Sequence, residues 1–304
     1  MRTATFSITA ALFISLLSTN GFANPPIPLT DCETITQPGN YILENDLVAS
    51  PQENCLVISS SHVNVDLNGG TITCIAPGEY PCSAFDESLA GIGIEIEADH
   101  VSISNGSVEN YETGIVGTAK YISATNLSLA TVTGILLSDV SFSVFANIEY
   151  DGLDLGGPAN PGPVLSVSGG GFNAFTSINS SYDTFEGIII KNSSFNLIED
   201  ASVSCAAEGV SGPGILITED SSRNLVAYNN VFVLFGNGIE VDLGSTENVI
   251  GGNTAVTATT EPGFYALLDQ NANCDSNVWI GNTFSNLFAP GSGEISASPA
   301  NCIH

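Results

Sequence analysis

Five acidic residues and one lysine follow successive glycine–apolar pairs at similar distances, so their types and spacing could support chemistry. They are Asp139, Lys191, Glu219, Asp220, Asp242 and Asp269. Calcium binds several carboxylate oxygens, and a lysine beside such an ion could serve as a general base. We therefore take Glu219, Asp220 and Asp242 as candidate calcium ligands. With Lys191 as the base, Glu219 and Asp242 would complete a candidate catalytic set.

The alternative role for this row is structural. Acidic residues in turns are well solvated, and Lys191 would then only relieve their mutual repulsion. Either role requires Lys191, Glu219 and Asp242 to lie in neighbouring repeats, because they are far apart in the sequence. The repeat that surrounds them therefore decides whether they meet.

Glycine followed by a branched apolar residue recurs along the chain at intervals of about 20 to 27 residues, which predicts a solenoid. The pairs are Gly114-Ile115, Gly134-Ile135, Gly187-Ile188, Gly214-Ile215 and Gly238-Ile239. Gly91-Ile92 and Gly263-Phe264 are weaker copies, and Pro163-Val164 fills a missing position. Short apolar runs between Gly, Asn, Ser and Asp clusters favour strands and turns. We therefore predict an all-β fold, a parallel β-helix of roughly nine coils over residues 55–284.

A second repeated phrase places two asparagines five residues apart around an apolar pair. Its six asparagines are Asn224, Asn229, Asn248, Asn253, Asn277 and Asn282. Asparagines at the same turn of successive coils can form a ladder of amide hydrogen bonds along the axis. We predict this ladder in preference to a ligand-binding role.

The chain begins with features of an exported protein. Residues 1–23 contain Arg2 and an apolar stretch from Phe6 to Leu17, which is typical of a secretory signal peptide. The stretch is too short for a comfortable membrane span, and no later segment is long and apolar enough. We expect a secreted or periplasmic protein with a cap over residues 24–54 and a capping tail over residues 285–304.

Seven cysteines in an exported chain favour disulfides. Pairing of Cys32 with Cys55 would tie the N-terminal cap to the first coil. Pairing of Cys274 with Cys302 would tie the tail to the last coil. Cys74 and Cys82 flank a short loop whose ends can meet, so they form the third expected pair. Cys205 is the seventh cysteine and belongs to none of these three pairs. A zinc site is the alternative, but neither Cys-x-x-Cys nor a Cys–His cluster occurs.

The chain is strongly acidic, with a formal net charge of −28. Nucleic acid and anionic membrane surfaces are poor partners for such a field. Polyuronates would also be repelled unless calcium bridged them. An acidic, solvated surface resists association between copies, so we expect a monomer.

A family resemblance is carried by four segments, residues 39–47, 55–58, 63–72 and 101–106. They resemble the opening and inner coils of bacterial secreted proteins of the pectin-lyase-like superfamily. The resemblance covers roughly residues 30–304 and implies a right-handed parallel β-helix. The superfamily includes polysaccharide lyases, hydrolases, epimerases, adhesins and proteins without a known reaction, so its likeness implies little about activity. The hydrolase motifs Asn-Thr-Asp and Gly-His-Gly and the epimerase motif Asp-Pro-His-Asp are absent from this sequence.

The rarer side chains favour structure over catalysis. His62 and His100 each precede an apolar strand at corresponding places in two early coils, so they are expected to stack in a turn. Trp279, the only tryptophan, could be a sugar platform, but packing in the core or the end cap is the preferred interpretation.

These observations favour a non-catalytic surface or matrix protein that binds polysaccharide, cell-surface glycans or other macromolecules, without a cofactor. The alternative is a carbohydrate-active enzyme, a lyase, hydrolase or epimerase, that acts on a neutral or calcium-bridged polysaccharide.

Overall fold

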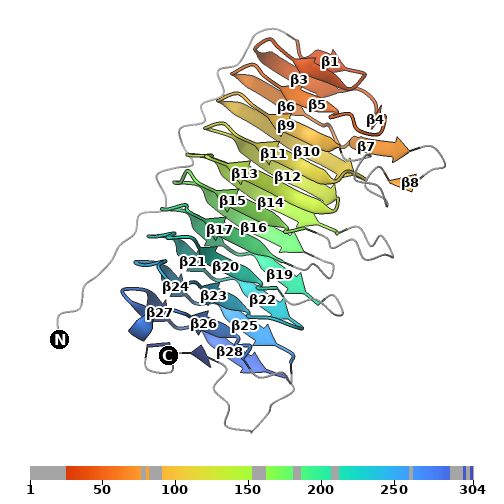
Figure 1. Ribbon diagram of the computed structural model, residues 1–304. Coiled ribbons are helices and arrows are strands. Elements are labelled where there is room, and N and C mark those ends of the chain that lie inside the picture. The colour runs from red at the N-terminus through yellow and green to blue at the C-terminus, as the bar shows by residue number, and fades with distance from the viewer. Residues whose placement is uncertain are drawn as a thin grey trace.

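The chain winds into a stack of short parallel strands, a right-handed parallel β-helix. The computed structural model describes residues 25–76, 80–81, 91–152, 162–180, 186–206, 212–259, 263–287, 297–298 and 302–303. Figure 1 shows the coils following one another from β1 at one end to β28 at the other. The predicted signal peptide, residues 1–23, lies outside the described residues.

One sheet, here called sheet B, receives one strand from each coil. Its strands in the described residues are β2 (Glu33–Ile35), β5 (Leu56–Ile58), β9 (Ile92–Ile96), β11 (Thr113–Gly117), β13 (Thr133–Ser138), β15 (Leu165–Ser168), β17 (Ile188–Lys191), β20 (Ile215–Thr218), β23 (Ile239–Val241), β26 (Leu267–Asp269) and β29 (Ala297–Ser298). Every neighbouring pair is parallel. Nine of these eleven strands fall within residues 55–284, in line with the roughly nine coils expected there.

The other sheet, sheet A, forms the remaining sides of each coil. Its strands are β1 (Ile27–Leu29), β3 (Gly39–Leu43), β4 (Leu47–Ala49), β6 (Val63–Asp66), β7 (Thr71–Ala76), β10 (Val101–Glu109), β12 (Ser123–Ala130), β14 (Val144–Tyr150), β16 (Ala174–Ser180), β18 (Leu197–Glu199), β19 (Ser202–Cys205), β21 (Leu225–Ala227), β22 (Asn230–Val233), β24 (Val249–Gly251), β25 (Thr254–Thr257), β27 (Val278–Ile280) and β28 (Thr283–Asn286). The short strand β8 (Tyr80–Pro81) runs antiparallel to β7. A single 3-10 turn, η3 (Ala272–Cys274), precedes β27 in the described part of the chain.

Sheet A bends where one residue per coil adopts a positive φ. In β10 and β12 the bend lies at Asn105 (φ 62°) and Asn126 (φ 55°), within one continuous strand. In later coils the bend separates two short strands, as at Asp200 (φ 54°) between β18 and β19. Each coil therefore has three sides, one from sheet B and two from sheet A.

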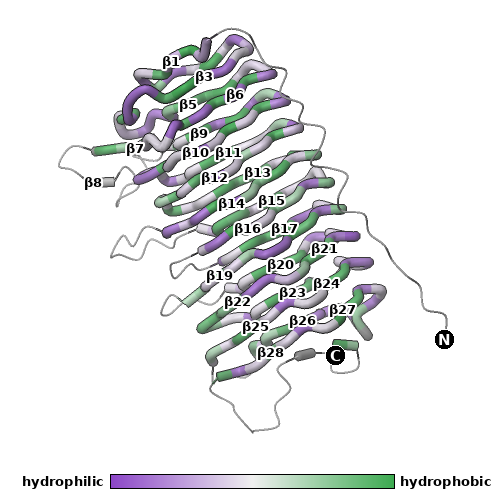
Figure 2. Tube along the Cα trace, turned by 180° about the vertical axis from the view of Figure 1, so that it is seen from behind, coloured by the Kyte–Doolittle hydropathy of each residue, from purple (hydrophilic) through white to green (hydrophobic). Residues whose placement is uncertain are grey.

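The interior of the stack is filled by apolar side chains that alternate with outward ones along each strand. Ile115, Ile135, Ile188, Ile215 and Ile239 are all fully buried and lie in register with inward residues of the neighbouring sheet B strands. Figure 2 shows hydrophobic positions recurring from coil to coil along the stack. Since a single coil has no interior of its own, its apolar surface is buried only by its neighbours.

The glycines of the Gly-Ile repeat allow adjacent coils to approach closely. A Cβ on Gly187 would lie 2.0 Å from the Gly214 carbonyl oxygen, and one on Gly214 would lie 2.8 Å from the Gly238 carbonyl oxygen. No side chain fits at such distances. The repeat is therefore a steric signature of coil stacking.

The register corrects two of the weaker repeat copies. Ile94, and not Ile92, pairs with Ile115, and Leu267, and not Phe264, pairs with Ile239. The strand that begins at Leu267 is thus shifted by three residues from the position that Gly263 suggests, because Ala266 occupies the place of the glycine.

The predicted asparagines lie in two buried rows between coils. In the first row, Asn224 Nδ2 donates to Asn248 Oδ1 at 3.1 Å, and Asn248 Nδ2 donates to Asn277 Oδ1 at 3.2 Å. Asn173 and Asn196 extend this row toward the N-terminus. In the second row the acceptors for Asn229 and Asn253 are, respectively, Asn253 at 2.9 Å and Asn282 at 3.0 Å. The amides also accept backbone N–H groups of the preceding coil, which satisfies polar groups inside the stack.

Disulfides tie both ends of the stack. Cys32 bonds to Cys55, and Cys274 bonds to Cys302. Residues 24–54 contribute β1 to β4, which pair in parallel with strands of the following coils. Cys74 is buried, but Cys82 lies outside the described residues, so their pairing stays a prediction. Cys205 is buried near the end of β19.

Candidate functional site

The predicted chemical row lies only partly on one face. Lys191 ends β17 and pairs with Thr218 of β20, and the Thr218 hydroxyl donates a hydrogen bond to Asp242, which follows β23. Lys191 and Asp242 therefore belong to one outward column of sheet B, with Thr218 between them.

The other two predicted ligands lie beyond the strand. Glu219 and Asp220 follow β20 with φ of 53° and 60°, and both side chains are exposed. Asp139 occupies a similar exposed position after β13, with φ of 56°. These acids are turn residues, and the register places Thr218, not Glu219, level with Lys191.

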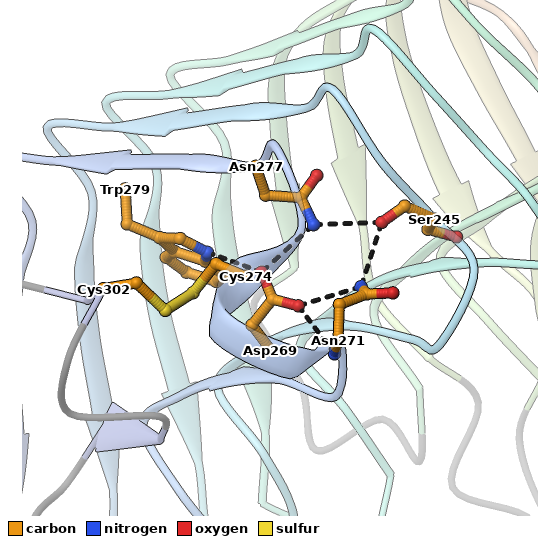
Figure 3. Close-up of a disulfide and its surroundings, with 7 residues drawn as sticks. All are labelled: Ser245, Asp269, Asn271, Cys274, Asn277, Trp279 and Cys302. Carbon is orange, nitrogen blue, oxygen red and sulfur yellow. Dashed lines mark hydrogen bonds between the residues drawn. A yellow bond between two sulfur atoms is a disulfide. The ribbon is translucent and has the colours of Figure 1, made fainter.

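Asp269 differs from the rest of the row because its side chain points into the core. It pairs with Val241, whose own partner is Ile217, and it is 3% exposed. Its carboxylate accepts hydrogen bonds from Trp279, Asn277 and Asn271 (Figure 3). Trp279 is buried in the last coils, so it presents no surface to a sugar.

Within the described ranges, no group of three or more histidine, cysteine, aspartate or glutamate side chains could share a metal ion. Calcium binding by Glu219, Asp220 and Asp242 stays a prediction that a solution experiment must test.

The structure brings forward one carboxylate that the sequence did not single out. Glu240 lies outward on β23, two residues before Asp242, and it accepts hydrogen bonds from Asn237 Nδ2 at 2.8 Å and Gln270 Nε2 at 2.5 Å. Positions two residues apart on a strand lie about 6.6 Å apart along the backbone, on the same face of the sheet. Glu240 and Asp242 both accept hydrogen bonds from amide or hydroxyl groups. This arrangement fits hydrogen-bond acceptors better than a general acid that donates a proton.

An exposed column of stacked rings, here called the aromatic ladder, runs along the turn before the second side of each coil. Its members are His62, His100, Tyr121, Phe142, Phe172 and Phe195. Adjacent ring centroids lie 4.5 to 5.4 Å apart with interplanar angles of 2 to 22°. The Arg223 guanidinium lies 5.4 Å from the centre of the Phe195 ring and pairs with Glu247, so the column continues over two more coils.

All six ring-bearing residues have φ between 56 and 61°. This left-handed conformation costs about 1 to 2 kcal/mol for a residue other than glycine, and ring stacking recovers about 0.5 to 1.5 kcal/mol per pair. Each ring from His100 to Phe195 is stacked on both faces, so its edge is the part that meets solvent. The stacking expected for His62 and His100 is thus part of a longer structural column.

The sequence signal for the ladder is weak. With Arg223 included, the column contains four residue types: His, Tyr, Phe and Arg. The feature that its members share is that the next residue in the sequence is buried. Only the strand register reveals that these places coincide.

Between two carboxylates, Asp66 in register with Ser104 and Glu149 in register with Ser128, the outward face of sheet A carries neutral polar side chains in columns, here called the polar grid. It consists of Asn64, Thr71, Ser102, Ser104, Asn105, Ser107, Ser123, Thr125, Asn126, Ser128 and Asn147. None of these side chains is buried, whereas the alternating residues Val101, Ile103 and Ala124 are.

Hydrogen bonds hold the bend column of this grid in place. Asn126 Nδ2 donates to Asn105 Oδ1 and Asn147 Nδ2 donates to Asn126 Oδ1, both at 3.1 Å. Asn126 uses one side-chain N–H group and one oxygen lone pair in this row, so a second N–H group and lone pair remain for water or a ligand. Asp66 lies at the N-terminal end of the row, 3.1 Å from Asn105 Nδ2.

A search for membrane-crossing helices in the described part of the chain finds none that is long and apolar enough. No family model matches this sequence, and a comparison with curated proteins finds no match.

Solved structures with a similar fold do exist. The Dettilon tailspike protein superposes with a TM-score of 0.62 at 15% identity, over 89% of this chain and 57% of the tailspike. The A-module of mannuronan C-5 epimerase AlgE6 from Azotobacter vinelandii superposes with a TM-score of 0.55 at 12% identity, over 81% of this chain and 77% of the module. This chain thus spans little more than half the length of the tailspike. At such identities the likeness concerns the fold: the chain is a parallel β-helix like those of the tailspike and the epimerase module.

Proposed function

We propose that this protein is a non-catalytic, exported β-helix that binds neutral glycans through the polar grid on sheet A. The observation that carries the proposal is the grid itself, a rigid array of uncharged hydroxyl and amide groups on a chain of net charge −28. Polyhydroxylated sugars form hydrogen bonds with many such donors and acceptors. A neutral glycan also avoids the electrostatic repulsion that an anionic polymer would meet on this acidic chain.

The spacing of the grid suits an extended polymer. Coils repeat about every 4.8 Å along the axis, and outward residues of one strand lie about 6.6 Å apart. A single exposed hydrogen bond contributes only about 0.5 to 1.5 kcal/mol, so useful affinity requires several coils at once. Since backbone pairing fixes the strands of successive coils, the grid is preorganised for ligand binding.

Two further observations support the proposal. The fold neighbours include a tailspike and a mannuronan epimerase module, and the second of these acts on a polysaccharide by its name. The end disulfides fit an exported protein, which would meet glycans outside the cytoplasm.

The test is binding to a panel of soluble neutral polysaccharides, measured by affinity electrophoresis and calorimetry. The variant Ser107→Ala/Ser128→Ala removes two neighbouring hydroxyls of one grid column and should weaken binding severalfold without lowering the melting temperature. The variant Ser202→Ala/Thr254→Ala makes a similar change in the same column beyond Glu149, where the grid ends, and should bind normally. Absence of binding to every neutral glycan, or equal binding by both variants, would refute the proposal.

A second candidate function is an enzyme acting at sheet B. It is favoured by one observation, the outward pair Glu240 and Asp242 with Lys191 two coils away. Purified protein incubated with uronate-containing and neutral polysaccharides, with and without calcium, should give neither unsaturated-uronate absorbance nor new reducing ends. Turnover that disappears in Glu240→Gln would establish the enzyme instead.

A further inference from the structure

The outward column of sheet A that contains Ser107 and Ser128 stays polar along the stack, through Ser202, Asn230 and Thr254. A second outward column, in register from coil to coil, is polar in the first coils and apolar afterwards. Its polar members are Asn40, Asn64, Ser102 and Ser123, and its apolar members are Val144, Ala174, Leu197, Leu225, Val249 and Val278. We call the six apolar members the apolar strip.

The strip is half-buried at Val144, Ala174, Leu197 and Leu225 and becomes exposed at its C-terminal end. Val249 is 37% exposed, Val278 is 49% exposed and the adjacent Ile280 is 62% exposed. Along its other side the strip is bordered by the edges of Phe142, Phe172 and Phe195. A single exposed valine needs no explanation, but a continuous apolar column over six coils marks an interaction surface.

The dimensions of the strip narrow the choice of partner. Five coil spacings give a length of about 24 Å. The strip, the aromatic ladder on one side of it and the column from Ala146 to Ile280 on the other, which includes Thr176 and Glu199, together give a width of about 13 Å. The resulting area is about 300 Å², whereas a stable protein interface buries about 800 Å² on each partner. A second copy of this chain would also carry a net charge of −28, so the two copies would repel each other. Area and charge therefore both disfavour self-association.

The physical properties of the strip instead fit the flat face of an ordered neutral polysaccharide. Sugar rings present C–H groups on their faces, and in an ordered array these faces form apolar bands. A straight, rigid, uncharged strip can cover such a band without bending. A soluble chain would lose conformational freedom on binding, whereas a chain already packed in a fibre loses little.

We propose that the apolar strip directs this protein to ordered, insoluble forms of a neutral polysaccharide, in preference to amorphous or soluble forms. This inference rests on the proposed glycan-binding function and assigns it a second contact surface. The polar grid forms hydrogen bonds to the glycan, and the strip covers the apolar face of a packed array.

The experiment measures depletion of the full exported chain from solution by microcrystalline cellulose and by crystalline chitin, each compared with its amorphous swollen form. The variant Val249→Thr/Val278→Thr keeps β-branched side chains of similar volume but makes the strip polar. Binding to the crystalline forms should become about fivefold to tenfold weaker, while binding to soluble glycans is unchanged. The matched control Val256→Thr makes the same change outside the strip, on an outward position of β25, and should bind like the unmodified chain.

The outcomes separate this inference from the proposed function. Equal binding to crystalline and amorphous forms, or full binding by the strip variant, overturns the inference while leaving soluble-glycan binding by the grid intact. Light scattering that shows a dimer abolished by Val249→Thr/Val278→Thr also overturns it, because the strip would then be an interface between copies. Loss of soluble-glycan binding in the grid variant, with crystalline binding retained, supports two separate surfaces.

Discussion

The indole Nε1 of Trp279 donates a hydrogen bond of 2.9 Å to the Asp269 carboxylate inside the last coils. The same carboxylate accepts Asn277 Nδ2 at 3.0 Å, and Asn271 through both its backbone N–H and its side chain. Asp269 thus ends the buried asparagine row with an acceptor, beside the Cys274–Cys302 disulfide (Figure 3).

Replacing Asp269 should be strongly destabilising. Asp269→Leu leaves the donors of Trp279, Asn277 and Asn271 without their acceptor, and each buried unsatisfied donor costs about 1 to 3 kcal/mol. We expect a loss of at least about 3 kcal/mol in the free energy of unfolding, measured with urea. The variant Glu97→Leu, at an exposed acid after β9 without a positive φ, serves as the control and should change stability little. Equal stability of the two variants would show that the Asp269 network contributes nothing.

Reduction should loosen the ends of the stack first. Each end disulfide is expected to contribute about 2 to 4 kcal/mol, and end coils have neighbours on one side only. Hydrogen exchange after mild reduction should therefore accelerate in β2 and β27 before it does in β13. Peptide mapping under non-reducing conditions checks the pairing, and free thiols at Cys55 or Cys274 would contradict it.

A charge in the core should unfold several coils together. Ile215 is fully buried and lies between Ile188 and Ile239 in the adjacent coils, so Ile215→Asp buries an unpaired carboxylate against both neighbours. The neighbouring outward variant Leu216→Asp is the matched control and should cost far less. Equal melting temperatures of the two variants would mean that the inward and outward positions of β20 are assigned wrongly.

Stability should fall at alkaline pH because of two buried tyrosines. Burial raises the pKa of Tyr111 and of Tyr150 above the ordinary value of 10.0, and nearby acids add to the shift, Glu53 for Tyr111 and Asp151 for Tyr150. Below pH 10 both are protonated in the folded and unfolded states. Above it the unfolded chain releases these protons while the folded chain retains them, so stability decreases as pH rises.

Urea titrations from pH 8 to pH 11 test this dependence. The decrease above pH 10 should be smaller in Tyr150→Phe, whatever that variant does to stability at pH 8. A flat profile up to pH 11 would contradict the effect of burial on these phenols.

Calcium should act on this chain only as a salt. Glu219 and Asp220 are exposed turn residues, so added calcium should raise the melting temperature weakly, and magnesium or sodium at equal ionic strength should do the same. Asp242→Asn should leave that response unchanged. A tight, magnesium-insensitive site that Asp242→Asn abolishes would establish the predicted calcium ligands and favour the enzymatic alternative.

The sequence predicts the coils well because their spacing has a steric cause. Glycine recurs at Gly187 and Gly214 since a Cβ there would collide with the next coil, and this constraint is visible in the residue type alone. The pairing of Cys32 with Cys55 follows from the same coil positions.

Site positions are harder to predict, because a shift of a few residues within one coil changes the side of the coil on which a residue lies. Counting from Gly263 groups Asp269 with the turn acids, whereas pairing with Val241 turns it into the core. The aromatic ladder is missed for another reason: Tyr121 and Phe142 share a place in the coil but no residue type with His62.

The burial of Trp279 also provides an intrinsic fluorescence probe of local unfolding. It is the only tryptophan in the sequence and lies in the last coils, held by Asp269. Its fluorescence therefore follows detachment of the C-terminal coils, while circular dichroism averages over all strands. If the stack opens from this end, the fluorescence signal should change at a lower temperature than the dichroism, and the interval between them measures how far the solenoid departs from all-or-none unfolding.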